Sequence, residues 1–246
     1  MAASTHLNGA TTTTSPLATP TQKSVFFFDI DNCLYPKSYK IHDRMSLLID
    51  KYFQENLSVT PEEATKLHQR YYKDYGLAIE GLVRHHKVDP MEYNEKVDDA
   101  LPLDEIIKPN PKLRKLIQDI DREQVKLWLF TNAYKTHGER VVKLLGIEHL
   151  FEGMTYCDYA AETNLLCKPR PEMYAKAMRD AGVEDVERCY FVDDSGLNAK
   201  AAKAFGWKAA HLVEPMSQGP EAPVADFQIA DLEELRTVFA ELFKPS

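Results

Sequence analysis

The sequence of 246 residues contains no apolar run of about 18 residues, the length that a membrane-spanning helix needs. It has no Lys or Arg before Lys23 and no apolar segment there, so we expect neither a secretory signal nor a transit peptide. Only four cysteines occur, without a CxxC pair or a His-rich neighbourhood, which disfavours a zinc site and a disulfide framework. These absences predict no membrane partner and a cytoplasmic or nucleocytoplasmic location.

The sequence also lacks an excess of basic residues. It has 30 Lys and Arg against 38 Asp and Glu, a net charge of -8, whereas proteins that bind nucleic acid polymers need basic surfaces. A small anionic substrate in a locally positive pocket remains compatible with this charge. The composition, 44% hydrophobic and 28% charged, is that of a globular protein, and the length suits one domain with at most a modest insert. The oligomeric state is left open.

The N-terminal residues 1–21 are rich in Thr, Ala, Ser and Pro and include a run from Thr11 to Thr14. Such a segment buries too little apolar surface to offset the entropy that it loses on ordering. We therefore predict a disordered tail and assign it no part in the chemistry.

A short apolar run from Val25 to Phe28 is typical of a strand that is covered on both faces of a parallel sheet. It ends in two acids, Asp29 and Asp31, and ligands of open α/β sheets bind beyond the carboxyl ends of the strands. Two carboxylates this close repel each other, which favours a bound cation. The alternative is a polar turn without chemistry, and the strand alone does not decide between them.

From Ile41 the hydrophobic residues follow a helical period, and Thr60-Pro61 with Glu63 marks the start of a second helix. No strand pattern occurs between residues 40 and 105. We interpret residues 39–100 as a helical cap inserted over the edge of the sheet. Its aromatic and basic residues either contact a substrate or form the core of the cap, and helical spacing favours the second fate for each one singly. They are Tyr39, Tyr52, Phe53, Tyr71, Tyr72, Tyr75, Arg84, His85 and His86.

Strands and helices then alternate, which predicts an α/β fold with a Rossmann-like parallel sheet formed by residues 22–38 and 101–246. The expected strands are residues 126–130, 153–156, 189–192, 208–212 and a short edge strand at 227–229. The expected helices are residues 110–121, 137–145, 172–181, 197–205 and 232–243.

Polar groups follow the later strands and loops in the same way as the first, at Thr131-Asn132, at Lys168 and at Asp193-Asp194. Each has an ordinary explanation, as a loop entry, a solvated charge or a helix cap. The parallel sheet nevertheless brings these ends to one edge. Together they supply what phosphoryl transfer needs: a carboxylate nucleophile, carboxylates for a cation, a hydroxyl and an ammonium group.

Four motifs in order along the chain resemble those of the haloacid dehalogenase-like hydrolase superfamily, over residues 24 to about 243. They are Phe28-Asp29-Ile30-Asp31, Phe130-Thr131-Asn132, Lys168-Pro169 and Val192-Asp193-Asp194. More narrowly, the chain resembles the fungal pyrimidine 5′-nucleotidase group. This second resemblance rests on Asp31-Asn32-Cys33-Leu34-Tyr35-Pro36, Tyr75-Gly76-Leu77-Ala78, residues 103–111 and Phe130-Thr131-Asn132-Ala133-Tyr134.

The resemblance implies that Asp29 is the nucleophile that becomes an aspartyl-phosphate. It implies that Asp31 protonates the leaving alkoxide, then activates water, and also binds Mg²⁺ through its backbone carbonyl. Thr131 and the backbone near Asn132 would bind the substrate phosphate. Lys168 would neutralise the charge of Asp29 and the phosphate.

The resemblance further implies that Asp194 binds Mg²⁺ directly and that Asp193 binds it directly or through water, as hard oxygen ligands suit this ion better than zinc. Two positions depart from the usual pattern. Cys33 stands where the superfamily usually has Thr or Val, and we expect it to pack without thiol chemistry. Residues 75–78 differ from the Tyr-Gly-Thr-Thr of many relatives, which leaves the contacts of the cap with the substrate open.

We therefore expect a Mg²⁺-dependent phosphomonoesterase that converts a small-molecule nucleotide, first of all UMP or CMP, to nucleoside and phosphate. Alternative substrates are nicotinamide mononucleotide, purine monophosphates and lysophosphatidate. A phosphomutase would need a bisphosphorylated sugar, and a dehalogenase would have no use for Asp31. The non-enzymatic alternative is a catalytically silent regulatory protein of the same fold.

Overall fold

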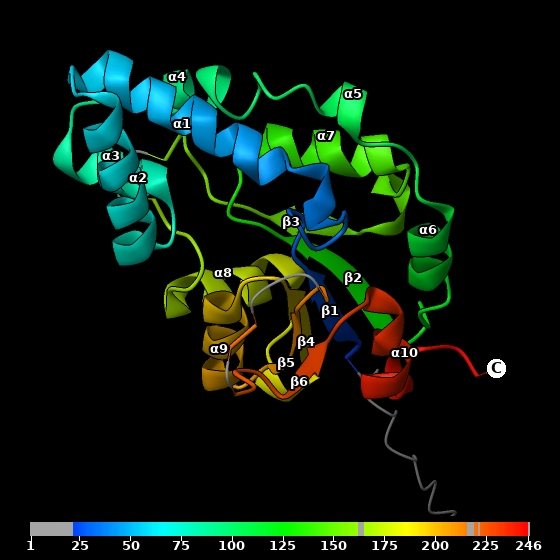
Figure 1. Ribbon diagram of the computed structural model, residues 1–246. Coiled ribbons are helices and arrows are strands. Elements are labelled where there is room, and N and C mark those ends of the chain that lie inside the picture. The colour runs from blue at the N-terminus through cyan, green and yellow to red at the C-terminus, as the bar shows by residue number, and fades with distance from the viewer. Residues whose placement is uncertain (1–21, 162–164, 216–218, 221, 246) are drawn as a thin grey trace, which may run out of the picture.

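The computed structural model describes residues 22–161, 165–215, 219–220 and 222–245, and a parallel sheet of six strands lies at its centre (Figure 1). The strand order is β3-β2-β1-β4-β5-β6. The bounds are β1 Ser24–Phe28, β2 Val125–Phe130, β3 Gly153–Thr155, β4 Cys189–Asp193, β5 Lys208–Leu212 and β6 Phe227–Ile229. This confirms the predicted α/β fold and all six strands. The tail predicted at 1–21 lies outside the described residues.

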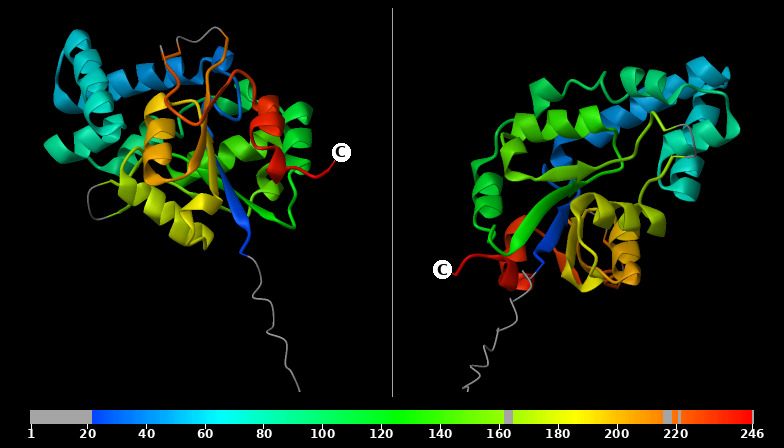
Figure 2. Two further views of the ribbon diagram at one scale, coloured as in Figure 1. Left: turned by 90° about the horizontal axis from the view of Figure 1, so that it is seen from below. Right: turned by 180° about the vertical axis from the view of Figure 1, so that it is seen from behind.

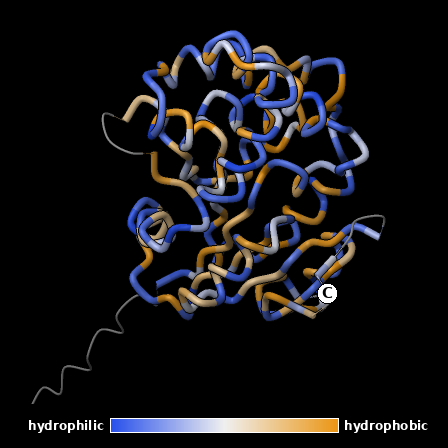
Figure 3. The backbone as a smooth tube through the Cα atoms, turned by 60° about the vertical axis from the view of Figure 1, so that its left-hand side comes forward, coloured by the Kyte–Doolittle hydropathy of each residue, from blue (hydrophilic) through white to orange (hydrophobic). Residues whose placement is uncertain are grey.

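Helices cover both faces of β1, as its uninterrupted apolar sequence requires. Phe26 and Phe28 pack on one face with α6 (Pro111–Gln118), α7 (Lys135–Leu145) and α10 (Leu235–Val238). Val25 and Phe27 pack on the other face with α8 (Pro171–Ala181) and α9 (Gly196–Phe205). Figure 2 shows β1 between these two layers, and Figure 3 shows hydrophobic and hydrophilic stretches alternating along the chain. No helix of the described residues is long and apolar enough to cross a membrane.

The segment expected to form the cap consists of helices joined by short loops, and residues 40–105, all of them described, contain no strand. Its helices are α1 (Ile41–Leu57), α2 (Pro61–Tyr75), α3 (Ala78–His85) and α4 (Pro90–Lys96), with a capping box at Thr60 and Glu63. The boundaries 39 and 100 remain a prediction, because the apolar core of the cap also includes Tyr159, Leu165 and Cys167 from beyond β3.

A buried ion pair also joins the cap to the sheet domain. Glu80 of α3 is fully buried, and its carboxylate contacts Arg84 at 2.5 Å and Arg170 at 2.7 Å. Arg170 lies two residues after Lys168 and directly before α8. Breaking a buried pair from one side leaves an uncompensated charge, so this contact holds α3 against the loop that carries Lys168.

The helix predicted at 232–243 is wrong as a single element. The structure has a 3-10 turn at Leu232–Glu234, one turn of α-helix in α10 and a 3-10 turn at Ala240–Leu242. Thr237, Val238 and Phe239 are poor helix formers, and Phe239 leaves the helical region with φ -127° and ψ 43°. Backbone pairing of Phe243 with Ile120 then extends the chain.

Two other helices differ from the prediction. The single-turn helix α5 (Leu103–Ile106) was not predicted, and α7 begins at Lys135, two residues before the predicted start.

Candidate active site

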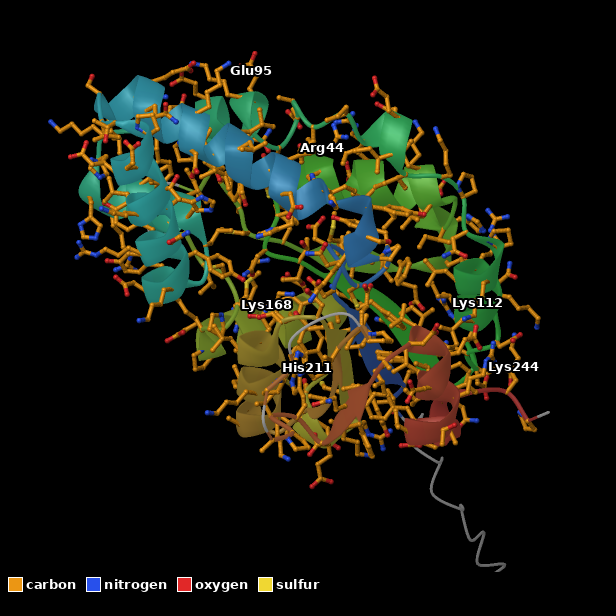
Figure 4. The ribbon with its side chains drawn as sticks, in the orientation of Figure 1. Arg44, Glu95, Lys112, Lys168, His211 and Lys244 are labelled. Carbon is orange, nitrogen blue, oxygen red and sulfur yellow. The ribbon has the colours of Figure 1, made fainter. Side chains whose placement is uncertain are left out.

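A cavity of about 470 Å³ lies between the carboxyl edge of the sheet and the cap helices. Figure 4 shows Lys168 at this level, between the strands and the helices above them. Every site residue predicted from the sequence lines the cavity, although the residues come from four separate parts of the chain. They are Asp29, Asp31, Thr131, Asn132, Lys168, Asp193 and Asp194.

Lys168 is fully buried, and its ammonium group is bound on three sides. Its Nζ donates to Asp29 Oδ1, to Asp193 Oδ2 and to the carbonyl of Phe130, each at 2.7 Å. Burial lowers the pKa of Lys168, but the two carboxylates outweigh burial and raise it above its usual value. Lys168 is therefore a fixed positive charge that links the ends of three strands or loops.

The side chain of Asn132 holds this lysine in place. Its Nδ2 donates to the carbonyl of Lys168 at 2.9 Å, and its Oδ1 accepts from the N–H of Lys168 at 2.7 Å. Within the described chain, the backbone N–H of Asn132 donates to no protein acceptor and can bind an anion, as predicted for the substrate phosphate. The buried Thr131 Oγ1 accepts from the N–H of Ala133 at 3.0 Å, which leaves the Thr131 O–H proton for a phosphoryl oxygen.

The carboxylates of Asp29, Asp193 and Asp194 form an acidic cluster, with one oxygen of each within 4.8 Å of the others. Burial and the charge of Asp193 raise the pKa of Asp29 well above its usual value, although Lys168 opposes them. Burial and Asp193 also raise the pKa of Asp194 to about 6, against the charge of Lys37 at 3.0 Å. The positive charges of Lys168 and Lys37 offset the negative charge of the three acids only in part. Such a set of carboxylate oxygens fits a hard cation such as Mg²⁺.

The carboxylate of Asp31 does not join this cluster. Its Oδ1 accepts from Tyr35 Oη and contacts His137 Nε2, both at 2.7 Å. Burial raises the pKa of Asp31, but the charge and hydrogen bond of His137 outweigh burial, so this pKa is lowered. Burial lowers the pKa of His137, and Asp31 raises it to about 9. The Asp31 backbone carbonyl accepts no hydrogen bond in the described residues, which keeps it free for the predicted Mg²⁺ contact.

Comparison with known proteins decides the family. The model of the haloacid dehalogenase-like hydrolase family matches residues 23–206. The chain belongs to this family. It is 40% identical over 200 residues to Phosphate metabolism protein 8 of Saccharomyces cerevisiae, an alignment that covers 78% of this chain and 62% of that protein. This chain therefore spans less than two thirds of the length of that relative.

Solved structures share the fold at low sequence identity. The haloacid dehalogenase-like hydrolase YfnB of Bacillus subtilis, bound to magnesium, is 14% identical, with a TM-score of 0.59 over 88% of this chain and 98% of that chain. A phosphatase of the family from Thermococcus onnurineus is 19% identical, with a TM-score of 0.57 over 89% and 98%. These similarities show the fold of this chain. Its substrate and reaction must be inferred from the residues of the site.

The structure adds three site residues to the family motifs: Tyr35, Lys37 and His137. Tyr35 and His137 bind Asp31, and Lys37 pairs with Asp194. Sequence reasoning missed them because no spacing rule connects residue 137 with residue 31. The sequence held a weak signal for Tyr35. It lies four residues after Asp31, and a turn of that length can bring its side chain back to Asp31. Cys33 is buried, and burial raises its pKa well above the usual value, in keeping with the packing role expected of it.

Of the cap residues singled out in the sequence, Tyr72 alone lines the cavity. Tyr52, Phe53 and Tyr71 belong to the cap core, which was the alternative. Arg84, His85 and His86 are not among the residues that line the cavity, so the structure gives no support to a contact of these three with the substrate.

Gly76 brings the cap close to the backbone of Lys168. It ends α2 with φ +82°, and a Cβ there would lie 2.8 Å from the carbonyl of Lys168 and 2.9 Å from Pro169 Cδ. Gly76→Ala is expected to lower both the melting temperature and kcat, because the Lys168 loop must shift. The matched control is Gly182→Ala, with φ +68° and no atom within 4 Å of its Cβ. The control should lose only about 1–2 kcal/mol for the left-handed backbone. Equal effects of the two variants on kcat would contradict the close approach.

Proposed function

We propose that this chain is a phosphomonoesterase that acts through an aspartyl-phosphate on Asp29. Asp29 lies at the end of β1, and its Oδ1 is bound by the ammonium group of Lys168. That cation offsets the repulsion between two anions, the carboxylate and the phosphate, as they approach. Thr131 and the free N–H of Asn132 lie in the same cavity and supply donors for phosphoryl oxygens.

The position of Asp31 is the observation that carries the proposal. Its carboxyl group lines the cavity with Asp29 but contacts Tyr35 and His137 instead of the acidic cluster. A second carboxyl group held apart from the cation site is what a general acid for a leaving alkoxide requires. Dehalogenation releases a halide and needs no such acid. A silent regulatory protein needs neither Asp31 nor the buried Lys168, whose desolvation costs stability.

We further propose Mg²⁺ as the cofactor, held by Asp29, Asp193, Asp194 and the backbone carbonyl of Asp31. The Asp194 carboxylate is the more available of the neighbouring pair, because Asp193 also accepts from the N–H of Ser195 at 2.7 Å and from Asn198 at 3.0 Å. When bound, the ion would neutralise charge on the phosphoryl group and on the cluster. The magnesium in the B. subtilis structure supports this choice.

We propose pyrimidine nucleoside 5′-monophosphates as the substrates, because the sheet edge can recognise only the phosphate and the cap limits the remaining space. The cavity, about 470 Å³, is in the range of small-molecule sites and must also hold the phosphoryl group and its ion. On the cap side, Met45, Ile49 and Leu77 offer apolar surface and Tyr72 an aromatic ring. Such a compartment favours a single-ring base over a purine.

His68 supplies an oriented polar group to this compartment. Its Nδ1 contacts Asp50 Oδ1 at 2.8 Å, and Thr65 holds the other oxygen of Asp50 at 2.7 Å. The Nε2 atom of His68 has no hydrogen-bond partner among the described residues, and the side chain lines the cavity. A ring nitrogen fixed in this way suits recognition of a polar edge, such as that of a nucleobase.

The test is a side-by-side series of kcat/KM values with UMP, CMP, AMP, GMP, nicotinamide mononucleotide and lysophosphatidate in the presence of Mg²⁺. UMP and CMP are expected to exceed AMP and GMP by at least ~10-fold, the effect of about 1.4 kcal/mol in transition-state binding. Purine nucleotides that react as well as UMP would overturn the pyrimidine assignment and leave the phosphatase proposal intact. No phosphate release from any ester would overturn both.

A further inference from the structure

Both hydrogen bonds to the Asp31 carboxyl group fall on the same oxygen. Tyr35 Oη donates to Oδ1 at 2.7 Å, and His137 Nε2 lies 2.7 Å from that same atom. Within the described residues, no protein donor contacts Oδ2. The side chain of Asp31 is 26% exposed and lines the cavity. One oxygen is therefore held by the protein, and the other is left for the substrate.

Two separate segments build this arrangement. Asn32 adopts φ +58°, and the N–H groups of Cys33 and Leu34 donate to the carbonyl of Ile30, so the chain turns and brings Tyr35 back to Asp31. His137 lies in the first turn of α7, and its side chain is completely buried. Val141, Val142 and Leu145 pack α7 on the sheet, so the fold fixes the backbone that carries His137.

We propose that Tyr35 and His137 are positioning residues that hold Asp31 by Oδ1, so that Oδ2 is the oxygen that gives and takes the proton. The inference rests on the proposed phosphatase function. In the first step an oxygen of Asp29 bonds to phosphorus, the ester P–O bond breaks, and the ester oxygen leaves as an alcohol with the proton from Oδ2. In the second step water attacks the aspartyl-phosphate, its proton passes to Oδ2, and phosphate leaves Asp29.

The hydrogen bonds persist through both steps. A proton on Oδ2 makes Oδ1 the carbonyl oxygen of a carboxylic acid, and a carbonyl oxygen still accepts from an O–H and an N–H. Asp31 can thus change its protonation state without rotating. This fixes the distance and direction of proton transfer, which general acid catalysis depends on.

The experiment compares two leaving groups, because only a poor one needs a well-placed acid. kcat/KM is measured for the primary-alcohol ester that the wild type cleaves best and for p-nitrophenyl phosphate. Tyr35→Phe and His137→Ala are expected to lower kcat/KM for the alkyl ester by about 10–100-fold. The loss in kcat/KM for the aryl ester should be several-fold smaller than the loss for the alkyl ester. His137→Gln, which returns an N–H donor, should restore most of the loss.

Asp31→Asn provides the reference for both variants. It should show the same preference for the aryl ester, and adding His137→Ala to it should cause no further loss, since the residues act as one unit. Equal losses on both esters, or additive losses in the double variant, would overturn the inference and make both residues purely structural. If His137→Ala fails to fold, Tyr35→Phe decides alone, because it removes only the hydroxyl and retains the ring stacked on Tyr39 at 6.1 Å. A wild type inactive on both esters would instead refute the proposed function.

Discussion

Asp29→Asn is expected to lower phosphate release by about 10⁴- to 10⁶-fold, because an amide cannot serve as the nucleophile. The folded structure should persist. Burial and the neighbouring Asp193 raise the pKa of Asp29, so its charge is unfavourable in the metal-free protein. A neutral side chain of the same shape removes that repulsion, while Lys168 keeps Asp193 and the carbonyl of Phe130 as partners. The melting temperature of the metal-free variant should equal or exceed that of the wild type.

The measurements are phosphate release, trapping of the acyl-phosphate after an acid quench, and thermal unfolding. The matched control is Asp74→Asn, the same change at an exposed residue of α2 whose one charge partner among the described residues is Arg70 at 3.5 Å. It should leave turnover and unfolding unchanged, because exposed ion pairs contribute little. Turnover by Asp29→Asn near the wild-type rate would rule out the aspartyl-phosphate mechanism.

Removal of divalent metal is expected to abolish turnover, and Mg²⁺ should restore it. Ca²⁺ should bind and inhibit, because its bonds are longer and its geometry looser than Mg²⁺ chemistry needs. Binding can also be followed without turnover, since a cation relieves the repulsion in the acidic cluster and should raise the melting temperature. Full activity in excess EDTA would contradict the metal assignment.

The rise in melting temperature should depend on pH in a defined direction. Because the pKa of Asp194 is raised to about 6, its protonated form is favoured by folding, and the metal-free protein loses stability as the pH rises from about 4 to 6. Mg²⁺ must displace that proton at pH 5 but not at pH 7.5, so the stabilisation should be larger at pH 7.5. Asp194→Asn should remove most of the metal-dependent rise, and an undiminished rise in this variant would place the ion elsewhere.

The sequence was sufficient to predict the sheet and the residues that gather at its edge. Strands β1, β2 and β4 are short, mainly apolar runs with polar groups at or directly after their last residue, and parallel strands bring their ends together whatever lies between them. The positions of Asp29, Thr131 and Asp193 in the cavity follow from this rule. Lys168 follows no strand; it was predicted as a polar group at a loop end, and the family resemblance gave it a role.

The partners of Asp31 could not be predicted in this way. His137 is 106 residues from Asp31 and meets it only because α7 packs against the sheet at a particular rotation. Helical spacing in the cap likewise predicts an apolar face but not which neighbour covers it. Tyr71 and Tyr72 are adjacent in α2, yet Tyr71 lies in the cap core and Tyr72 lines the cavity. Which side chains meet, and which line the cavity, depends on tertiary packing, and a local sequence pattern does not predict tertiary packing.

The buried contact between Glu80 and Arg170 limits how this cap can be exchanged for that of a relative. A transplanted cap without an acid at position 80 would leave Arg170 without its partner, two residues after Lys168. A cap with a bulkier residue than glycine at position 76 would press on the Lys168 carbonyl. An exchange of the cap thus also disturbs the segment that carries Lys168. An engineered chimera should therefore retain residues 76, 80 and 168–170 together.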